Sequence, residues 1–165
     1  MMADQIDELE GELVVQCDAD KLYTAITSGA PSLPKYLPQL IHKCQIFPGG
    51  CEISVGSIFV WDYVIEGKSS TVTTKEKITA VDHKNMLITC TVFEGDTAIS
   101  YPSFATTVQI TPIGGGSNES KVKWSIKYEI KKSEHDVIPT PTSFVNFLET
   151  FFIELGVKLL EEEKS

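Results

Sequence analysis

The sequence predicts an α+β fold in which a curved antiparallel sheet wraps around one long C-terminal helix. The middle of the chain alternates apolar and polar residues at period two, which is typical of half-buried strands. These segments follow one another through short turns, so neighbouring strands are expected to be antiparallel. The last part of the chain carries a single apolar stripe at helical spacing. A curved sheet that holds one helix leaves space between the two unless side chains fill it.

The chain begins with a predicted strand and two short helices. The strand covers residues 5–16 and has apolar residues on one face. Asp18 is a typical N-cap residue for a helix over residues 19–27, which Gly29 then ends. A second short helix is predicted over residues 32–40, where three prolines bracket it.

Six strands are predicted to follow, separated by turns rich in Gly, Asp and Asn. Their ranges are 42–48, 56–65, 69–81, 85–93, 99–111 and 120–131. One of the tight turns between them is Glu94-Gly95-Asp96. The alternation is clearest in the last strand, where apolar residues from Val122 to Ile130 occupy every second position.

The C-terminal segment predicts a long helix over residues 142–162. Prolines at positions 139 and 141 end the preceding loop, and Thr142 or Ser143 can cap the helix. Its apolar stripe consists of Phe144, Phe147, Leu148, Phe151, Leu155 and Leu159. The helix ends in three consecutive glutamates, which the helix dipole does not favour, so fraying is expected there.

Composition and charge exclude several classes of function. The chain has 165 residues and a net charge of −9, which suits neither nucleic acid nor an anionic membrane. The acidic start resembles neither a secretory signal nor a transit peptide, and no apolar run approaches the ~20 residues of a membrane span. We therefore expect one domain over residues 1–165, located in the cytoplasm as a monomer or weak homodimer.

The cysteines and histidines do not form a metal-binding pattern. The chain has four cysteines, none of them in a CxxC pair, and three dispersed histidines. Without a secretory signal, disulfides are not expected. We expect no metal and no redox cofactor. His135, in the loop before the long helix, lies near the expected mouth of any internal cavity.

The most distinctive strand is GSIFVWDYVI, which follows a loop containing Gly49, Gly50 and Gly56. Phosphate-binding glycine loops lead into a helix, whereas this one leads into a strand, so nucleotide binding is not indicated. Phe59, Trp61 and Tyr63 share one face of the strand at period two. Such a face predicts either a tightly packed core or a hollow that holds a ligand.

Four motifs in this order resemble those of the plant Bet v 1-like superfamily, and of its major latex protein-like branch in particular. They are VGSIFVWDYVIEGK, VFEGD, WSIKYE and the PTP of the loop before the long helix. Residues 12–21 also look like the start of poppy-type proteins of alkaloid metabolism. The resemblance covers residues 10–161 and implies a helix-grip fold, with a seven-stranded sheet, two short helices that close one end, and a large apolar cavity.

The resemblance and the inward faces of the elements together predict a set of ligand-binding residues. Members of the superfamily bind steroids, flavonoids, cytokinins and alkaloids, so the inner aromatic and apolar side chains are expected to line the cavity. The predicted lining consists of Phe59, Trp61, Tyr63, Glu76, Ile88, Cys90, Phe104, Thr106, Trp124, Ile126, Tyr128, Phe144, Phe147, Leu148 and Phe151.

Glu76 is the carboxylate that strict alternation places on the inner side of a strand, where it shares a face with Val72, Ile78 and Ala80. A lone carboxylate in an apolar cavity has a raised pKa and can act as a general base. The alternative is an outward Glu76 between two lysines, shifted by an irregularity in the strand.

Three functions remain open from the sequence. The weakest is ribonuclease activity, which the resemblance implies through pathogenesis-related relatives, because the net charge of −9 and the absence of a basic groove do not suit RNA. The other two are favoured over it. The first is a binding protein for a hydrophobic or amphipathic plant molecule of roughly steroid or alkaloid size. The second is a cofactor-independent cyclase or isomerase of specialised metabolism, because some relatives implied by the resemblance are enzymes. Its candidate catalytic residues are Glu76, Tyr63 and Tyr128.

Overall fold

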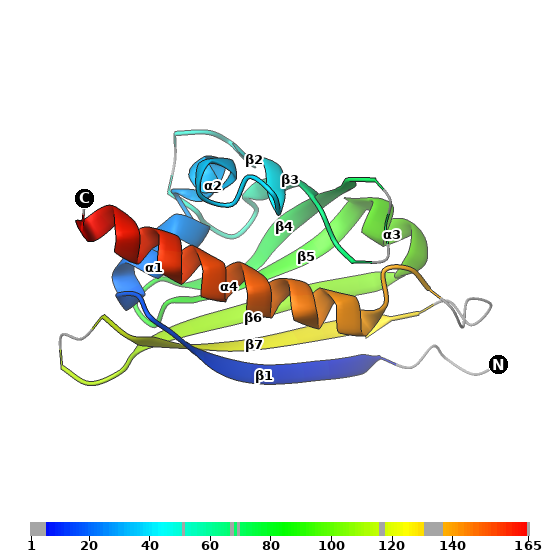
Figure 1. Ribbon diagram of the computed structural model, residues 1–165. Helices are drawn as coiled ribbons and strands as arrows, with labels where there is room; N and C mark the ends of the chain where they lie inside the picture. The colour runs from blue at the N-terminus through cyan, green and yellow to red at the C-terminus, as the bar shows by residue number, and fades with distance from the viewer. Residues whose placement is uncertain are drawn as a thin grey trace.

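The computed structural model describes residues 6–50, 52–66, 68, 70–115, 118–130 and 137–164. These residues form a seven-stranded antiparallel sheet in the order β1-β7-β6-β5-β4-β3-β2. The strands are β1 (Asp7–Val15), β2 (Ile41–Phe47), β3 (Ile58–Tyr63), β4 (Val72–Asp82), β5 (Leu87–Gly95), β6 (Ser103–Pro112) and β7 (Ser120–Glu129). The helix-grip fold predicted from the sequence is confirmed, because the long helix α4 (Pro141–Lys164) crosses one face of this sheet (Figure 1).

Shorter helices surround the sheet. Helix α1 (Ala19–Ile26), the 3-10 helix η1 (Ala30–Ser32) and α2 (Leu33–Tyr36) lie between β1 and β2, and α3 (Asp96–Ser100) lies between β5 and β6. Asp18 caps α1 as predicted, since its side chain accepts a hydrogen bond from the backbone N–H of Lys21. The second short helix ends at Tyr36 rather than residue 40, because Pro38 disfavours a helical conformation at the residue before it.

Helix α3 was missed by the sequence prediction. The segment was expected to be a tight turn followed by a strand from residue 99, but β6 begins only at Ser103. The side chain of Asp96 accepts a hydrogen bond from the backbone N–H of Thr73 at 2.9 Å, which joins the start of α3 to β4. Pro102 follows the helix and cannot continue its hydrogen bonding.

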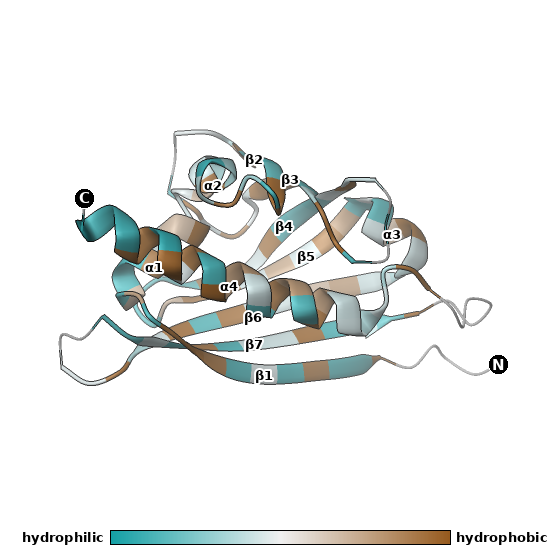
Figure 2. Cartoon of the chain, in the orientation of Figure 1, coloured by the Kyte–Doolittle hydropathy of each residue, from teal (hydrophilic) through white to brown (hydrophobic). Residues whose placement is uncertain are grey.

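The C-terminal end of α4 is helical through Lys164, so the expected fraying is not found. In Figure 2 these last turns are largely hydrophilic, and two of their glutamates contact the short helices. Glu163 forms an ion pair with Lys21 of α1, and the Tyr36 hydroxyl donates to Glu162 at 2.7 Å. These contacts offset the unfavourable charge at the end of the helix dipole.

Irregularities in strand pairing curve the sheet towards α4. The register shifts between Lys75 and Glu76 and again between Ile78 and Ala80 in the β4–β5 pair. A β-bulge bends its strand and increases the local twist. The β6–β7 pair, by contrast, is regular over its whole length. No helix in the described part of the chain is long and apolar enough to cross a membrane.

Candidate functional site: a cavity between the sheet and helix α4

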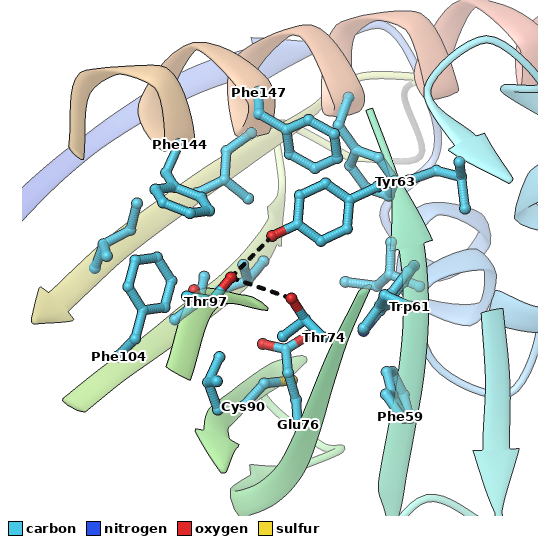
Figure 3. Close-up of a pocket in the computed structure, with 18 of the residues that line it drawn as sticks. Phe59, Trp61, Tyr63, Thr74, Glu76, Cys90, Thr97, Phe104, Phe144 and Phe147 are labelled. Atoms are coloured by element: carbon cyan, nitrogen blue, oxygen red, sulfur yellow. Dashed lines mark hydrogen bonds between the residues drawn. The ribbon is translucent and has the colours of Figure 1, made fainter. Parts of the chain in front are cut away.

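A cavity of about 140 Å³ lies between the inner face of the sheet and α4 (Figure 3). Strands β2 to β7 supply one wall and α4 supplies the opposite wall. The lining is almost entirely apolar and aromatic, with a few hydroxyls and one carboxyl. The space that the curved sheet leaves is therefore incompletely filled by side chains.

Most of the side chains predicted to line a cavity do so. They are Phe59, Trp61, Tyr63, Glu76, Ile88, Cys90, Phe104, Thr106, Ile126, Phe144, Phe147, Leu148 and Phe151. The sequence prediction did not include Ile26, Ile41, Thr74, Val92, Thr97, Val108 and Phe152, which also line it. Alternation could have indicated Thr74, which lies two positions before Glu76, but Thr97 belongs to the helix that was not predicted.

Two predicted residues lie outside the cavity lining although both are buried. Trp124 lies directly opposite Gly11 in the β1–β7 pair. A Cβ added at Gly11 would stand 2.6 Å from the Trp124 ring, so the indole occupies the space that a side chain on β1 would fill. Tyr128 instead packs edge-on against Tyr101, with ring centroids 5.9 Å apart.

Aromatic rings from α4 meet aromatic rings from the sheet across the cavity. The ring centroids of Tyr63 and Phe147 are 4.9 Å apart, and those of Phe104 and Phe144 are 4.6 Å apart. Phe147 also stacks with Phe151 of the next helical turn at 6.2 Å. These offset and tilted contacts are favourable for aromatic pairs. They also narrow the cavity from the helix side.

One side of the cavity carries a chain of hydroxyl groups from three different elements. The hydroxyls of Tyr63 on β3 and Thr97 on α3 are 3.4 Å apart, and those of Thr97 and Thr74 on β4 are 3.1 Å apart (Figure 3). Two hydrogen bonds join three hydroxyls, so one O–H donor remains, together with several acceptor lone pairs. This polar wall can therefore offer either a donor or an acceptor to a bound molecule.

Glu76 adds a carboxyl group beside this chain, close to Thr74 and Cys90 (Figure 3). The inward orientation is the first of the two that the sequence left open. Ala80, expected on the same face, is exposed, because the register shift after Ile78 changes which residues point inward.

Burial raises the pKa of Glu76 to about 7, since the apolar surroundings disfavour the charged form. The indole of Trp61, which lies beside the carboxyl, partly offsets that rise. The indole Nε1 itself is buried and makes no hydrogen bond of good geometry with any described residue.

The other titratable groups of the cavity stay protonated at neutral pH. Burial raises the pKa of Tyr63 to about 12 and that of Cys90 well above its ordinary value. Within the described part of the chain, no lysine, arginine or histidine lines the cavity, and no group of three or more His, Cys, Asp and Glu side chains is placed to hold a metal. Glu76 is therefore the lining group able to exchange a proton near neutral pH.

The histidines do not contribute to the cavity as far as the structure describes them. His83 accepts a hydrogen bond from the Tyr23 hydroxyl at Nδ1 and donates from Nε2 to the Ile53 carbonyl, both at 2.7 Å, which joins α1 to two loops. His42 contacts the Thr71 hydroxyl on the exposed side of the sheet edge. His135, a candidate for the cavity mouth, lies outside the described residues.

Comparison with known proteins identifies the family. The sequence profile of the pathogenesis-related protein Bet v 1 family matches residues 4–162. The chain belongs to the Bet v 1 family. Among its relatives, MLP-like protein 43 of Arabidopsis thaliana is 37% identical over 158 residues, which are 96% of each chain. Major latex protein 22 of Papaver somniferum is 33% identical over 142 residues, covering 86% of this chain and 84% of the relative.

Solved structures of other plant proteins share the fold. The ginseng major latex-like protein 151 from Panax ginseng superimposes with a TM-score of 0.78 at 25% identity, covering 92% of this chain and 96% of that one. Norcoclaurine synthase from Thalictrum flavum gives a TM-score of 0.71 at 23% identity, covering 98% of each chain. The resemblance seen in the four sequence motifs is thus confirmed.

Proposed function

We propose that this Bet v 1 family member binds a small hydrophobic or amphipathic plant molecule in the cavity between its sheet and α4. The observation that carries the proposal is the cavity itself, whose apolar and aromatic lining is interrupted by a compact polar wall. Sites for small molecules are typically concave and mostly apolar, with a few polar groups that fix the ligand's orientation.

The size of the cavity limits what it can hold without rearrangement. Its volume of about 140 Å³ is below the ~300–1,000 Å³ of typical small-molecule sites. An engineered apolar cavity of about 150 Å³ binds benzene. The cavity therefore suits a group the size of one ring, and a steroid-sized molecule would have to displace α4 side chains such as Phe147 and Leu148.

A cytoplasmic location is part of the proposal. Cys17, Cys44 and Cys90 are free thiols in the part of the chain that the structure describes. Free thiols are typical of proteins that work in a reducing compartment. Imaging of a fluorescent fusion in plant cells tests this part independently of ligand binding.

Binding is tested with propylbenzene, a neutral molecule of one ring and a short chain, by ligand-detected NMR and calorimetry. We expect saturable binding to the wild-type protein. Thr106→Phe places a ring in the cavity and should abolish binding, whereas Thr111→Phe puts the same residue at an exposed position of the same strand and should not. Folded wild-type protein that binds neither propylbenzene nor other single-ring compounds would contradict the proposal.

A second candidate function rests on Glu76. A general acid or base is most effective when its pKa lies near the working pH, and the pKa of Glu76 is about 7. The cavity would then belong to a cofactor-independent cyclase or isomerase, with Glu76 transferring a proton and Tyr63 orienting the substrate. Tyr128 has no place in this mechanism because it lies outside the lining.

Native mass spectrometry after incubation with a plant metabolite extract separates the two candidates. A carrier returns its bound molecule chemically unchanged, and an enzyme releases an altered one. If turnover is found, Glu76→Gln should lower the rate by about 10²–10⁴-fold. An unimpaired variant would remove Glu76 from the mechanism.

A further inference from the structure

The charge balance of the cavity is one-sided. Glu76 supplies its carboxyl, and none of the other lining residues that the structure describes carries a basic group that could pair with it. A buried carboxylate is costly unless it is paired, so in the empty cavity the proton stays on Glu76 much more readily than in water. The described lining residues supply no cation to pair with the ionised form, so a cationic ligand would meet an unpaired carboxylate there.

The hydrogen-bonding groups around Glu76 also favour its ionised form in the presence of a ligand. The buried N–H of Trp61 makes no hydrogen bond of good geometry with any described residue, although the indole lies beside Glu76. An ionised carboxylate is a stronger acceptor than a protonated one and has lone pairs for two donors. Ionisation of Glu76 would therefore give the indole N–H a better acceptor and leave the other carboxylate oxygen for the ligand.

The remaining walls suit the same kind of ligand. An ammonium group has three donors and no acceptor, and the hydroxyls of Thr74, Thr97 and Tyr63 can rotate to accept from it. The rings of Tyr63 and Phe147 also line the cavity, and a desolvated cation close to an aromatic ring is favourable. The net charge of −9 also favours the approach of cations over anions.

We propose that the ligand carries one aromatic ring and a protonated amine, with the ring among the phenylalanines of α4 and the ammonium paired with Glu76. This proposal rests on the proposed function, because it names the class of molecule that occupies the same cavity. It excludes carboxylate ligands, which would meet Glu76 without any basic side chain among the described lining residues to neutralise them.

The pairing makes binding depend on pH. The titratable groups that face Glu76 are Cys44 on β2, Tyr63 on β3 and Cys90 on β5, and all three stay neutral at neutral pH because burial raises their pKa values. The part of α4 that lines the cavity contributes only phenylalanines and a leucine. With the pKa of Glu76 at about 7, its ionised fraction rises about tenfold between pH 6 and pH 8, while an alkyl amine stays protonated.

The test compares three probes of nearly equal shape by calorimetry. They are 2-phenylethylamine, which is cationic, propylbenzene, which is neutral, and phenylacetate, which is anionic. At pH 8 we expect the amine to bind the wild-type protein at least tenfold more tightly than propylbenzene, and the anion to bind most weakly. At pH 6 the affinity for the amine should be about tenfold lower than at pH 8, and that for propylbenzene should be unchanged.

Two variants assign the effect to one carboxyl. Glu76→Gln should remove both the preference for the amine and its dependence on pH while still binding propylbenzene. Glu94→Gln makes the same change in net charge at a side chain that is 59% exposed, and it should behave like the wild type. Tight binding of propylbenzene without any preference for the amine would overturn this inference and leave the proposed function standing. A pH dependence that survives in Glu76→Gln would overturn it too, and binding of none of the three probes would overturn both.

Discussion

Replacing Glu76 by glutamine should change how the stability of the protein depends on pH. Burial raises the pKa of this carboxyl from 4.5 to about 7, so the native state binds the proton more tightly than the unfolded chain does. At about 1.4 kcal/mol for each pH unit, the proton stabilises the native state by about 3 kcal/mol below pH 4.5. That contribution falls as the pH rises and is lost above the native pKa, with about 2.5 kcal/mol of the loss between pH 5 and pH 8.

Glutamine keeps the shape of the side chain but is neutral at every pH, so the variant lacks this loss. Urea unfolding of both proteins at pH 5 and pH 8 gives four free energies of unfolding. From pH 5 to pH 8, the free energy of unfolding of the variant should rise by about 2.5 kcal/mol relative to that of the wild type. This relative change does not depend on how the amide affects stability at pH 5. The exposed control Glu94→Gln should show no such gain. A gain below about 0.5 kcal/mol for Glu76→Gln would mean that its carboxyl is solvated in the native protein, and the reasoning on the cavity would fail.

Three other substitutions test the surroundings of the cavity. Trp124→Ala should lower the free energy of unfolding by about 3–5 kcal/mol, as for packed core aromatics, and leave ligand affinity unchanged because the ring lies outside the lining. Gly95→Ala should lower the free energy of unfolding by about 2–3 kcal/mol, since Gly95 has φ 106° and a Cβ would lie 2.4 Å from the Thr73 carbonyl oxygen. Tyr101→Phe should lower it by about 1–2 kcal/mol by removing the buried 2.6 Å hydrogen bond to the Pro139 carbonyl. Urea unfolding measures each effect. If one of the three variants had the same free energy of unfolding as the wild type, the corresponding contact would not be made in solution.

Most elements of the fold could be predicted because the alternation of apolar and polar residues continues over enough positions to identify a strand or a helix. The strands and α4 bury one face each, and that face repeats over seven or more residues in most of them. Helix α3 could not be read in this way, because five residues carry too little periodicity. Its start is joined to β4 through Asp96 and the backbone of Thr73, a contact that exists only once the sheet has formed.

For the site, the sequence predicts only which side chains point towards the inner face of the sheet. Alternation places Trp61 and Trp124 on the same inner face of the sheet, yet only Trp61 reaches the cavity. The difference lies in the neighbouring strand, where Gly11 leaves room beside Trp124. Pairing register is not visible in one sequence, so the sequence could not separate packed core from cavity wall. The hydroxyl contributed by Thr97 was missed for a related reason, since its helix depends on tertiary contacts.

Pairing of an amine with Glu76 and proton transfer by Glu76 to a neutral substrate require opposite behaviour of one proton, and this difference can be measured without knowing the natural ligand. If a protonated amine pairs with Glu76, binding must expel the proton that the empty cavity holds there. With the pKa at about 7, binding of 2-phenylethylamine at pH 6.5 should release about 0.8 proton, and at pH 8 about 0.1 proton.

A proton-transfer enzyme that binds a neutral substrate keeps the proton on Glu76, or returns it within the turnover, so no net release accompanies binding. Calorimetry in two buffers with different ionisation enthalpies gives the number of protons released. Release of about 0.8 proton by the wild type and none by Glu76→Gln would support the ion pair. Tight amine binding at pH 6.5 without proton release would show that the carboxyl keeps its proton in the complex, and an amine held by a neutral Glu76 would contradict the pairing.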